Sequence, residues 1–133
     1  NVSLDAVADK PAQLALQPEH LKTFERMVTE ADAIFGGRPF DRYRFLLAMT
    51  DRMGGIGLEH QRSSENQFEP DSLVKWDEMD WDRNVVAHEL VHAWNGKYRR
   101  PEGLWTADYR IPMQNNLLWV YEGQTQFWGW VLA

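Results

Sequence analysis

The stretch that most constrains this chain is His88-Glu89-Leu90-Val91-His92, which lies within the apolar run of residues 85–95. In a helix, side chains four residues apart share one face, so His88 and His92 would lie together with Glu89 on the adjoining flank. Two neutral imidazoles can fill two of the four tetrahedral positions of a zinc ion, with a third protein ligand from elsewhere and a water in the open position. Glu89 is then placed to act as general base toward that zinc-bound water.

The same pattern has an alternative reading without metal, in which both histidines are hydrogen-bonded members of the core. The sequence around the two histidines favours the zinc interpretation. The neighbouring residues are strongly apolar, and the run ends at Asn95-Gly96, which is a good helix stop. A buried helix that carries two histidines and a glutamate needs partners for three polar groups, and one bound metal satisfies them together.

Length and composition limit the class of protein. The 133 residues suffice for one domain with a modest core, and 44% of them are hydrophobic. The formal net charge of -6 argues against a nucleic-acid-binding surface, and no apolar run is long enough for a membrane span. The chain has no cysteine, so any metal ligands must be histidine and carboxylate. The cellular compartment stays open between cytoplasmic and periplasmic or secreted.

Periodicity gives a coarse order of elements. Residues 1–17 show no clear period and are expected to form a poorly ordered leader before a catalytic domain over residues 18–133. Within that domain, residues 18–31 carry the apolar stripe of an amphipathic helix, and the aromatic-rich residues 43–49 favour a strand. Residues 65–80 are polar and irregular, which indicates a surface loop before the histidine-bearing helix.

A glycine-rich stretch, residues 53–64, allows two interpretations. It contains Gly54, Gly55 and Gly57 and then Glu59-His60. One interpretation is a loose hairpin turn with a solvated glutamate and histidine. The other is an edge strand along a cleft, whose unpaired backbone groups bind an extended peptide while Glu59 points at a charged group.

The run of residues 115–130 predicts a second buried helix, in which Glu122 is the only charged residue. An unpaired buried carboxylate is costly, so Glu122 requires a cation. An ion pair with Arg99 or Arg100 would satisfy it, but a role as the third zinc ligand explains it better. Gln126, one turn further along, is expected to support the site or to be an ordinary polar helix residue.

Three linked segments make a family resemblance specific. Residues 88–97 with the following Arg-Arg-Pro, residues 118–125 and residues 54–60 resemble, in type, order and spacing, the M61 family of glycyl aminopeptidases. These enzymes are gluzincins, similar to thermolysin and related to the M1 aminopeptidases.

The resemblance implies a role for each matching residue. His88, His92 and Glu122 would bind one zinc ion, and Glu89 would be the general base. By analogy with M1 enzymes, Glu59 would hold the free amino group of the substrate, which makes residues 54–59, with the neighbouring histidine, the substrate-binding segment.

The resemblance also implies a fold and an extent. The expected architecture is an α+β, thermolysin-like zincin core in which an antiparallel sheet packs on the zinc-binding helix. Family members are much longer, so the chain is interpreted as a fragment truncated before a helical region whose missing domains would cover the apolar C-terminal helix. A residue that stabilises the oxyanion would lie downstream. Tyr98, Tyr109 and His60 are the candidates within the chain, and spacing selects none of them.

The function expected from the resemblance is a zinc-dependent aminopeptidase. It would release N-terminal residues, small ones such as Gly or Ala, from peptides with a free N-terminus. Two alternatives stay open: a zinc endopeptidase, in which Glu59 has no role in binding an amine, and an inactive, metal-stabilised peptide-binding fragment.

Overall fold

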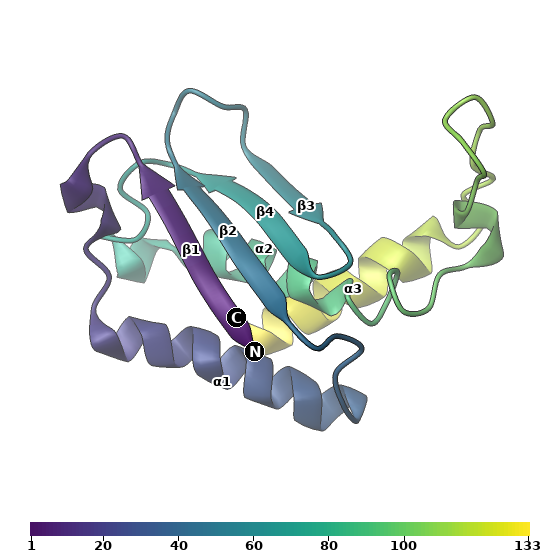
Figure 1. Ribbon diagram of the computed structural model, residues 1–133, viewed down its shortest axis with the longest axis horizontal. Coiled ribbons are helices and arrows are strands. Elements are labelled where there is room, and N and C mark those ends of the chain that lie inside the picture. Colours follow the sequence, from purple (N-terminus) through teal and green to yellow (C-terminus); the bar gives the residue numbers. More distant parts are fainter.

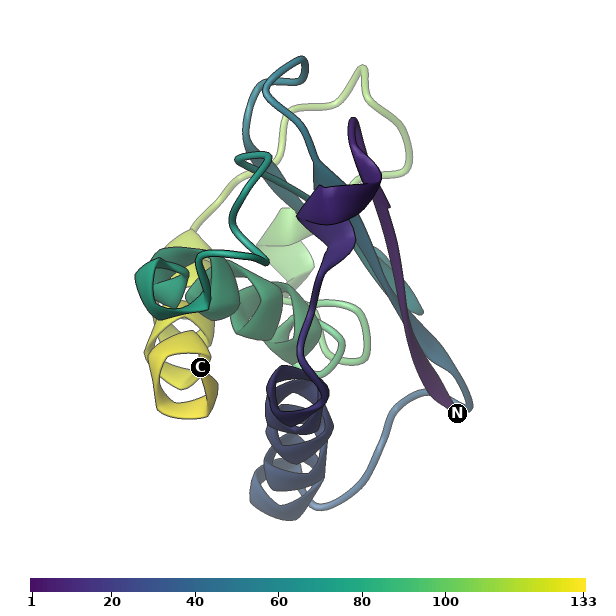
Figure 2. The ribbon, with the colours of Figure 1, turned by 90° about the vertical axis from the view of Figure 1, so that its left-hand side faces the viewer.

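A four-stranded sheet with helices on one face forms the frame of the computed structural model, which describes residues 1–133 (Figure 1). Figure 2, a view along the sheet, shows the three long helices on the same side of it. Short 3-10 turns lie between some of these elements. The main elements, in chain order, are β1 (Val2–Ala8), α1 (Pro18–Phe35), β2 (Tyr43–Met49), β3 (Ile56–Glu59), β4 (Ser63–Phe68), α2 (Asp80–Val91) and α3 (Leu118–Leu132).

The sheet is mixed, with strand order β1-β2-β4-β3. β1, β2 and β4 run parallel, and only β3 pairs antiparallel with its neighbour β4. The α+β class is confirmed, but the predicted antiparallel sheet is wrong. The crossover through α1 returns the chain to the starting end of the sheet, so β2 aligns parallel with β1. β4 then inserts between β2 and β3, which leaves β3 as the edge strand that the glycine-rich stretch suggested.

The prediction of a poorly ordered leader over residues 1–17 is wrong. Val2–Ala8 forms β1 and pairs along its whole length with β2. Its even-numbered residues, from Val2 to Ala8, pack against the core, whereas Asp5 and Val7 are exposed. This is the period-2 pattern of a half-buried strand, and it went unrecognised because small residues alternate with apolar ones. The sheet therefore begins before the domain boundary predicted at residue 18.

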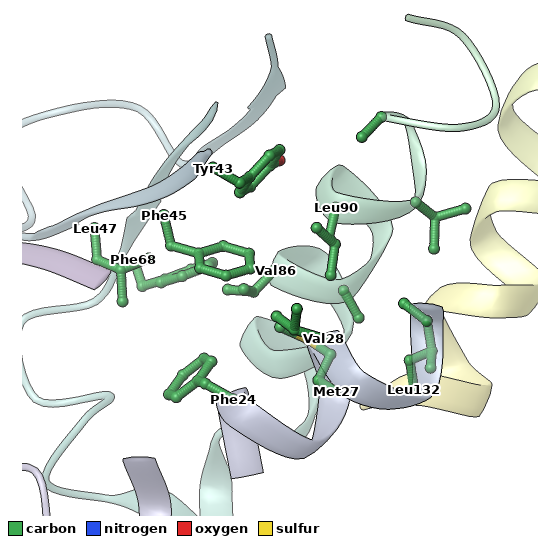
Figure 3. Packing of buried hydrophobic residues seen from close by; sticks show 14 of the residues in the cluster. Phe24, Met27, Val28, Tyr43, Phe45, Leu47, Phe68, Val86, Leu90 and Leu132 are labelled. Carbon is green, nitrogen blue, oxygen red and sulfur yellow. The ribbon is translucent and has the colours of Figure 1, made fainter. Parts of the chain in front are cut away.

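The core lies between the sheet and helices α1 and α2 (Figure 3). Alternate residues of β2 are buried, from Tyr43 to Met49, which confirms the strand predicted there. The helix predicted from residue 18 is also confirmed, and it ends where Gly36 adopts the left-handed φ of 76°. The labelled members of the core are Phe24, Met27, Val28, Tyr43, Phe45, Leu47, Phe68, Val86, Leu90 and Leu132.

β4 occupies part of the segment predicted as a loop. It was missed because its buried face is polar rather than apolar. Ser64 and Asn66 are fully buried, and Asn66 Nδ2 donates a hydrogen bond to Ser64 Oγ at 3.0 Å. Buried polar side chains that bond one another can occupy a sheet face that sequence patterns assign to apolar residues.

Helices α2 and α3 pack closely, and their ends differ from the predicted ones. α2 ends at Val91, after which residues 92–95 continue as a turn. α3 begins after Leu117, two residues later than the predicted start at Asn115, which has a positive φ of 56°. The helices approach at Gly129, where a Cβ atom would lie 3.3 Å from the His88 Cβ. None of the helices is long and apolar enough to cross a bilayer.

Candidate metal centre

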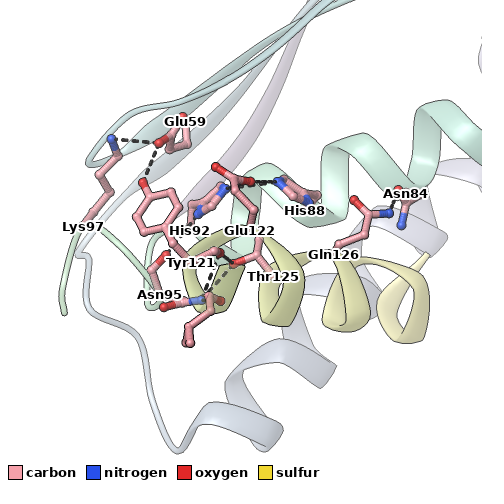
Figure 4. A network of polar contacts seen from close by, with 11 residues as sticks. Glu59, Asn84, His88, His92, Asn95, Lys97, Tyr121, Glu122, Thr125 and Gln126 are labelled. Carbon is pink, nitrogen blue, oxygen red and sulfur yellow. Dashed lines mark hydrogen bonds and ion pairs between the residues drawn. The ribbon is translucent and has the colours of Figure 1, made fainter. Parts of the chain in front are cut away.

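Three side chains from two helices converge on one point (Figure 4). His88 Nε2 lies 3.0 Å from His92 Nε2 on the next turn of the chain. Glu122, in α3, brings its Oε2 atom to 3.2 Å from His88 Nε2 and 3.5 Å from His92 Nε2. The packing of α3 against α2 therefore places the carboxylate beside both imidazoles.

The spacing of these three atoms fits a tetrahedral zinc ion. Metal–nitrogen and metal–oxygen bonds of about 2.0–2.2 Å in a tetrahedron separate neighbouring ligand atoms by about 3.3–3.5 Å. The observed separations of 3.0, 3.2 and 3.5 Å are close to such an edge length. Two histidines and one carboxylate also form a donor set found in catalytic zinc sites that keep one position open.

Asn95 lies outside the triangle of His88 Nε2, His92 Nε2 and Glu122 Oε2, the metal triangle, and orients the residues that form it. The ring of His92 is 2% exposed, and its Nδ1 lies 3.0 Å from the backbone oxygen of Asn95. A hydrogen bond donated by Nδ1 leaves the lone pair of Nε2 free for a metal. Asn95 Nδ2 donates to the backbone oxygens of Val120 and Tyr121 and to Thr125 Oγ1. One residue thus ties the end of α2 to the start of the helix that carries Glu122.

Glu89 is 6% exposed and lies under strand β3. A Cβ atom on Gly57 would overlap the Glu89 carboxylate and would lie 2.7 Å from Val85 Cγ1, so only glycine allows β3 to come this close to α2. Burial, with the negative charges of Glu59 and Glu122, raises the pKa of Glu89 to about 8 in the metal-free protein. A cation bound nearby would favour the ionised carboxylate.

Glu59, the last residue of β3, lies close to the metal triangle but is already paired. Its Oε1 accepts a hydrogen bond from the Tyr121 hydroxyl at 2.6 Å and lies 3.4 Å from Lys97 Nζ. Although burial raises the pKa of Glu59, the Tyr121 hydrogen bond and the charges of His92 and Lys97 bring it below its usual value. Glu59 therefore stays ionised, and Figure 4 shows it beside the metal triangle.

A cavity of about 230 Å³ joins Glu59 to the metal triangle, because Glu59, Tyr121 and Glu122 all line it. Its other walls come from the loop before α3 and the first turn of that helix. Arg100 is the positively charged lining residue, and its Nε donates to the backbone oxygen of Gly96. The cavity is large enough for a small side chain next to the metal triangle.

Several residues proposed from the sequence lie elsewhere. His60 projects from the outer face of the sheet, where its Nε2 lies 3.8 Å from Glu65 Oε2. Gly54 has open space around it. Tyr98 is 67% exposed and Tyr109 is fully exposed, and neither lines the cavity between Glu59 and Glu122.

The structure also shows where the partners of Glu122 and Gln126 lie. Neither Arg99 nor Arg100 forms an ion pair with Glu122, which is the alternative that the sequence left open. Gln126 Nε2 donates to Asn84 Oδ1 at 2.8 Å, one turn before His88, so it joins the helices instead of contacting Glu122.

Tyr121 and Lys97 are site residues that the sequence interpretation missed. Tyr121 lies directly before Glu122, and its ring packs on the His92 ring with centroids 4.5 Å apart. A tyrosine inside an apolar helix signals a hydroxyl that needs a partner, because buried phenols are usually hydrogen-bonded. That signal was available, but the identity of the partner was not.

Comparisons with known proteins gave one family-model match and a structural similarity. Residues 81–133 match the family model described as M61 glycyl aminopeptidase, which confirms the resemblance for that part of the chain. The structure is similar to the crystal structure of an aminopeptidase N family protein from Idiomarina loihiensis, with a TM-score of 0.77 and 23% sequence identity. The similarity covers 97% of this chain and 22% of that one. No curated protein matches the chain. At this sequence identity the structural similarity shows the fold alone, and the chain spans about a fifth of the length of that protein.

Proposed function

We propose that the chain carries the centre of a zinc-dependent aminopeptidase, which releases N-terminal residues, small ones such as Gly or Ala, from peptides. The observation that carries the proposal is the triangle of His88 Nε2, His92 Nε2 and Glu122 Oε2, whose spacing fits zinc. Zinc, when bound, supplies Lewis-acid chemistry that polarises the scissile carbonyl and makes a water more acidic.

Glu89 is the group that moves the proton in this proposal. Its carboxylate accepts a proton from the attacking water and then passes it to the nitrogen of the leaving peptide. Its position next to the metal ligand His88 on α2, under β3, shields it from bulk water. Burial raises the pKa of Glu89 and a bound cation would lower it again, and a carboxylate near neutral pKa is suited both to accepting and to returning a proton.

Glu59 binds the free amino group of the substrate. Tyr121 and Lys97 both contact Oε1, which leaves Oε2 for the substrate ammonium. The ion pair with Lys97 means that the substrate amine competes with, or adds to, an ammonium already beside the carboxylate. Because Glu59 and Glu122 line one cavity, an amine held at Glu59 brings the first peptide bond to the metal triangle.

The edge strand β3 offers backbone groups for the rest of the peptide. In the β3–β4 hairpin, His60 N–H donates to Ser63 O. In an antiparallel ladder, hydrogen-bonded pairs alternate with pairs that are not hydrogen-bonded. Gly57 and Glu59 belong to the second kind. Their backbone N–H and C=O groups point to the free edge, where an extended peptide can pair with them.

The test compares peptides with a free and an acetylated N-terminus, using the zinc-loaded chain. Release of the first alanine from free Ala-Ala-Ala-Ala, with no cleavage of the acetylated peptide, is the expected outcome. Cleavage of both peptides at internal bonds would indicate an endopeptidase. If neither peptide is cleaved although zinc is bound, the chain does not carry aminopeptidase activity by itself. Glu89→Gln is the control for contaminating peptidases, since it should bind zinc and lose turnover.

A further inference from the structure

A second hollow, of about 300 Å³, lies at the start of β3, at the other end of the strand from Glu59. Its walls come from the β3–β4 hairpin and from the first half of α2. It is partly apolar and partly polar. Its lining includes Ile56, Gln67, Glu69, Trp81, Asp82 and Val85.

This hollow begins beside the proposed general base. Gly57 and Val85 both line it. Both lie beside Glu89, since a Cβ atom on Gly57 would overlap the Glu89 carboxylate and lie 2.7 Å from Val85 Cγ1. Val85 lies about one turn before Glu89 on α2, and Trp81 lies one turn earlier still. The hollow therefore extends from Glu89 toward the N-terminal end of α2.

Its free polar side-chain atoms are hydrogen-bond acceptors, and of its two carboxylates Asp82 accepts a hydrogen bond from the Ser72 side chain. Gln67 is 5% exposed, and its Nε2 donates to the backbone oxygens of Thr50 and Phe68. That orientation leaves Gln67 Oε1 buried with no hydrogen-bond partner. Neither Glu69 nor Asp82 forms an ion pair, and no Lys or Arg lines the hollow.

Two cations lie nearby, Lys75 and Arg83, and neither forms an ion pair with Glu69 or Asp82. Lys75 lines an adjoining hollow together with Glu69 and Asp82, but it makes no ion pair with either of them. Arg83 is occupied by Asp80 and by the backbone oxygen of Trp76. The hollow thus combines a buried acceptor, two carboxylates without ion pairs and apolar walls. Such a site favours a ligand that is cationic at its tip and apolar along its length.

We infer that this hollow binds the second residue of the substrate and selects lysine or arginine there. The inference rests on the proposed function, in which Glu59 holds the amine at one end of β3 and bond cleavage takes place beside Glu89. The leaving part of the peptide must then continue toward the opposite end of β3. Its first side chain meets the hollow next to Glu89.

A lysine or arginine side chain matches the chemistry of the walls. The methylene stem lies against Val85, Ile56 and the Trp81 ring, which is 62% exposed. The charged head reaches Asp82 and Glu69, and its N–H groups supply the donor that Gln67 Oε1 lacks. Norleucine has the same stem as lysine without the charge, so a comparison of the two isolates the polar part of the interaction.

The experiment measures Kd by calorimetry for Ala-Lys-Ala amide and Ala-norleucine-Ala amide, on the zinc-loaded Glu89→Gln variant, which does not turn peptides over. The lysine peptide is expected to bind about tenfold more tightly, as for a charge-assisted contact that is partly exposed to solvent. Adding Asp82→Asn and Glu69→Gln should reduce this preference to less than twofold. Adding Glu78→Gln instead removes a charge from the adjoining hollow only and should preserve it.

Equal Kd values for the two peptides, no binding of either, or a preference that survives in the Asp82→Asn, Glu69→Gln protein would overturn the inference. Hydrolysis of the same peptides by the zinc-loaded wild-type chain separates it from the proposed function. If alanine is released from neither peptide, the aminopeptidase proposal fails, while the ratio of Kd values still decides whether the hollow prefers lysine. If alanine is released equally well from both peptides and the Kd values agree, only the inference about the hollow fails.

Discussion

The hydroxyl of Tyr121 donates a hydrogen bond to Glu59 Oε1 at 2.6 Å, although the two residues are 62 positions apart in the chain. This contact joins α3, which carries the proposed metal ligand Glu122, to the edge strand that carries the proposed amine anchor. The ring of Tyr121 also packs on His92. Tyr121 therefore contacts both the proposed amine anchor and one of the candidate metal-binding histidines.

Tyr121→Phe should raise KM for peptides with a free N-terminus about fivefold to tenfold and leave zinc content unchanged. The phenol provides a charge-assisted hydrogen bond, whose loss is worth about 1–1.5 kcal/mol at a half-buried site. Steady-state kinetics with a free Ala-Ala peptide measures this change. Tyr98→Phe, at an exposed position, is the matched control and should behave as wild type. An unchanged KM in Tyr121→Phe would show that Tyr121 does not position Glu59.

Asn95→Ala should weaken zinc binding about tenfold to hundredfold, because groups that orient a metal ligand typically contribute that much. The backbone oxygen of residue 95 stays, but the bonds from Asn95 Nδ2 to α3 are lost, so Glu122 is no longer held beside the histidines. Competition with a chelator measures the affinity. Asn116→Ala, at an exposed position before α3, serves as control. An affinity in Asn95→Ala equal to that of the control would contradict this role.

Gly57→Ala should push β3 away from α2, because the new methyl group would overlap the Glu89 carboxylate and Val85 Cγ1. We expect a loss of about 1–3 kcal/mol in the free energy of unfolding, as for other overpacked sites, together with a marked drop in kcat. Urea unfolding and kinetics measure the two effects. Gly54→Ala, at a position with open space around it, should cause neither. If both variants resemble wild type, β3 does not lie as close to Glu89 as described.

The metal-free protein should lose stability relative to Glu89→Gln as the pH rises from about 4.5 to about 8. The folded state raises the pKa of Glu89, so between these values it binds a proton that the unfolded state releases, and folding becomes less favourable with pH. The expected change in the difference is on the order of 3 kcal/mol. Burial lowers the pKa of His92, an effect of opposite sign that is common to both proteins.

Urea unfolding of both proteins at pH 5, 6.5 and 8, with chelator present, tests this linkage. Zinc should shrink the difference, because a nearby cation favours the ionised carboxylate. A difference in stability that is the same at all three pH values would mean that Glu89 titrates normally in the folded protein.

The three residues of the candidate metal site could be singled out from the sequence because their chemistry is local. His88 and His92 are related by one helical turn, and Glu122 is the only charge in an apolar helix, so each is visible in a short window. The pairing of Tyr121 with Glu59 has no such pattern, since it depends on how α3 packs against the sheet.

The sheet was harder to predict than the helices. β1 is built from small and apolar residues in weak alternation, and β4 buries Ser64 and Asn66, so neither shows the apolar period of a typical strand. Parallel pairing also depends on residues far apart in sequence: Val2 aligns with Tyr43, and Arg44 aligns with Ser63. Local periodicity carries no information about such partners, whereas the strand at residues 43–49, with its large alternating side chains, was recognised.

The most direct test of the account is the zinc affinity of the purified chain, measured beside that of Glu122→Ala and of Glu65→Ala, which removes a half-exposed carboxylate outside the metal triangle. We expect one equivalent of zinc in the wild-type protein and in Glu65→Ala, and an affinity lower by at least about a hundredfold in Glu122→Ala. A wild-type chain that binds no zinc after reconstitution, or an affinity unchanged in Glu122→Ala, would contradict the three-residue metal site.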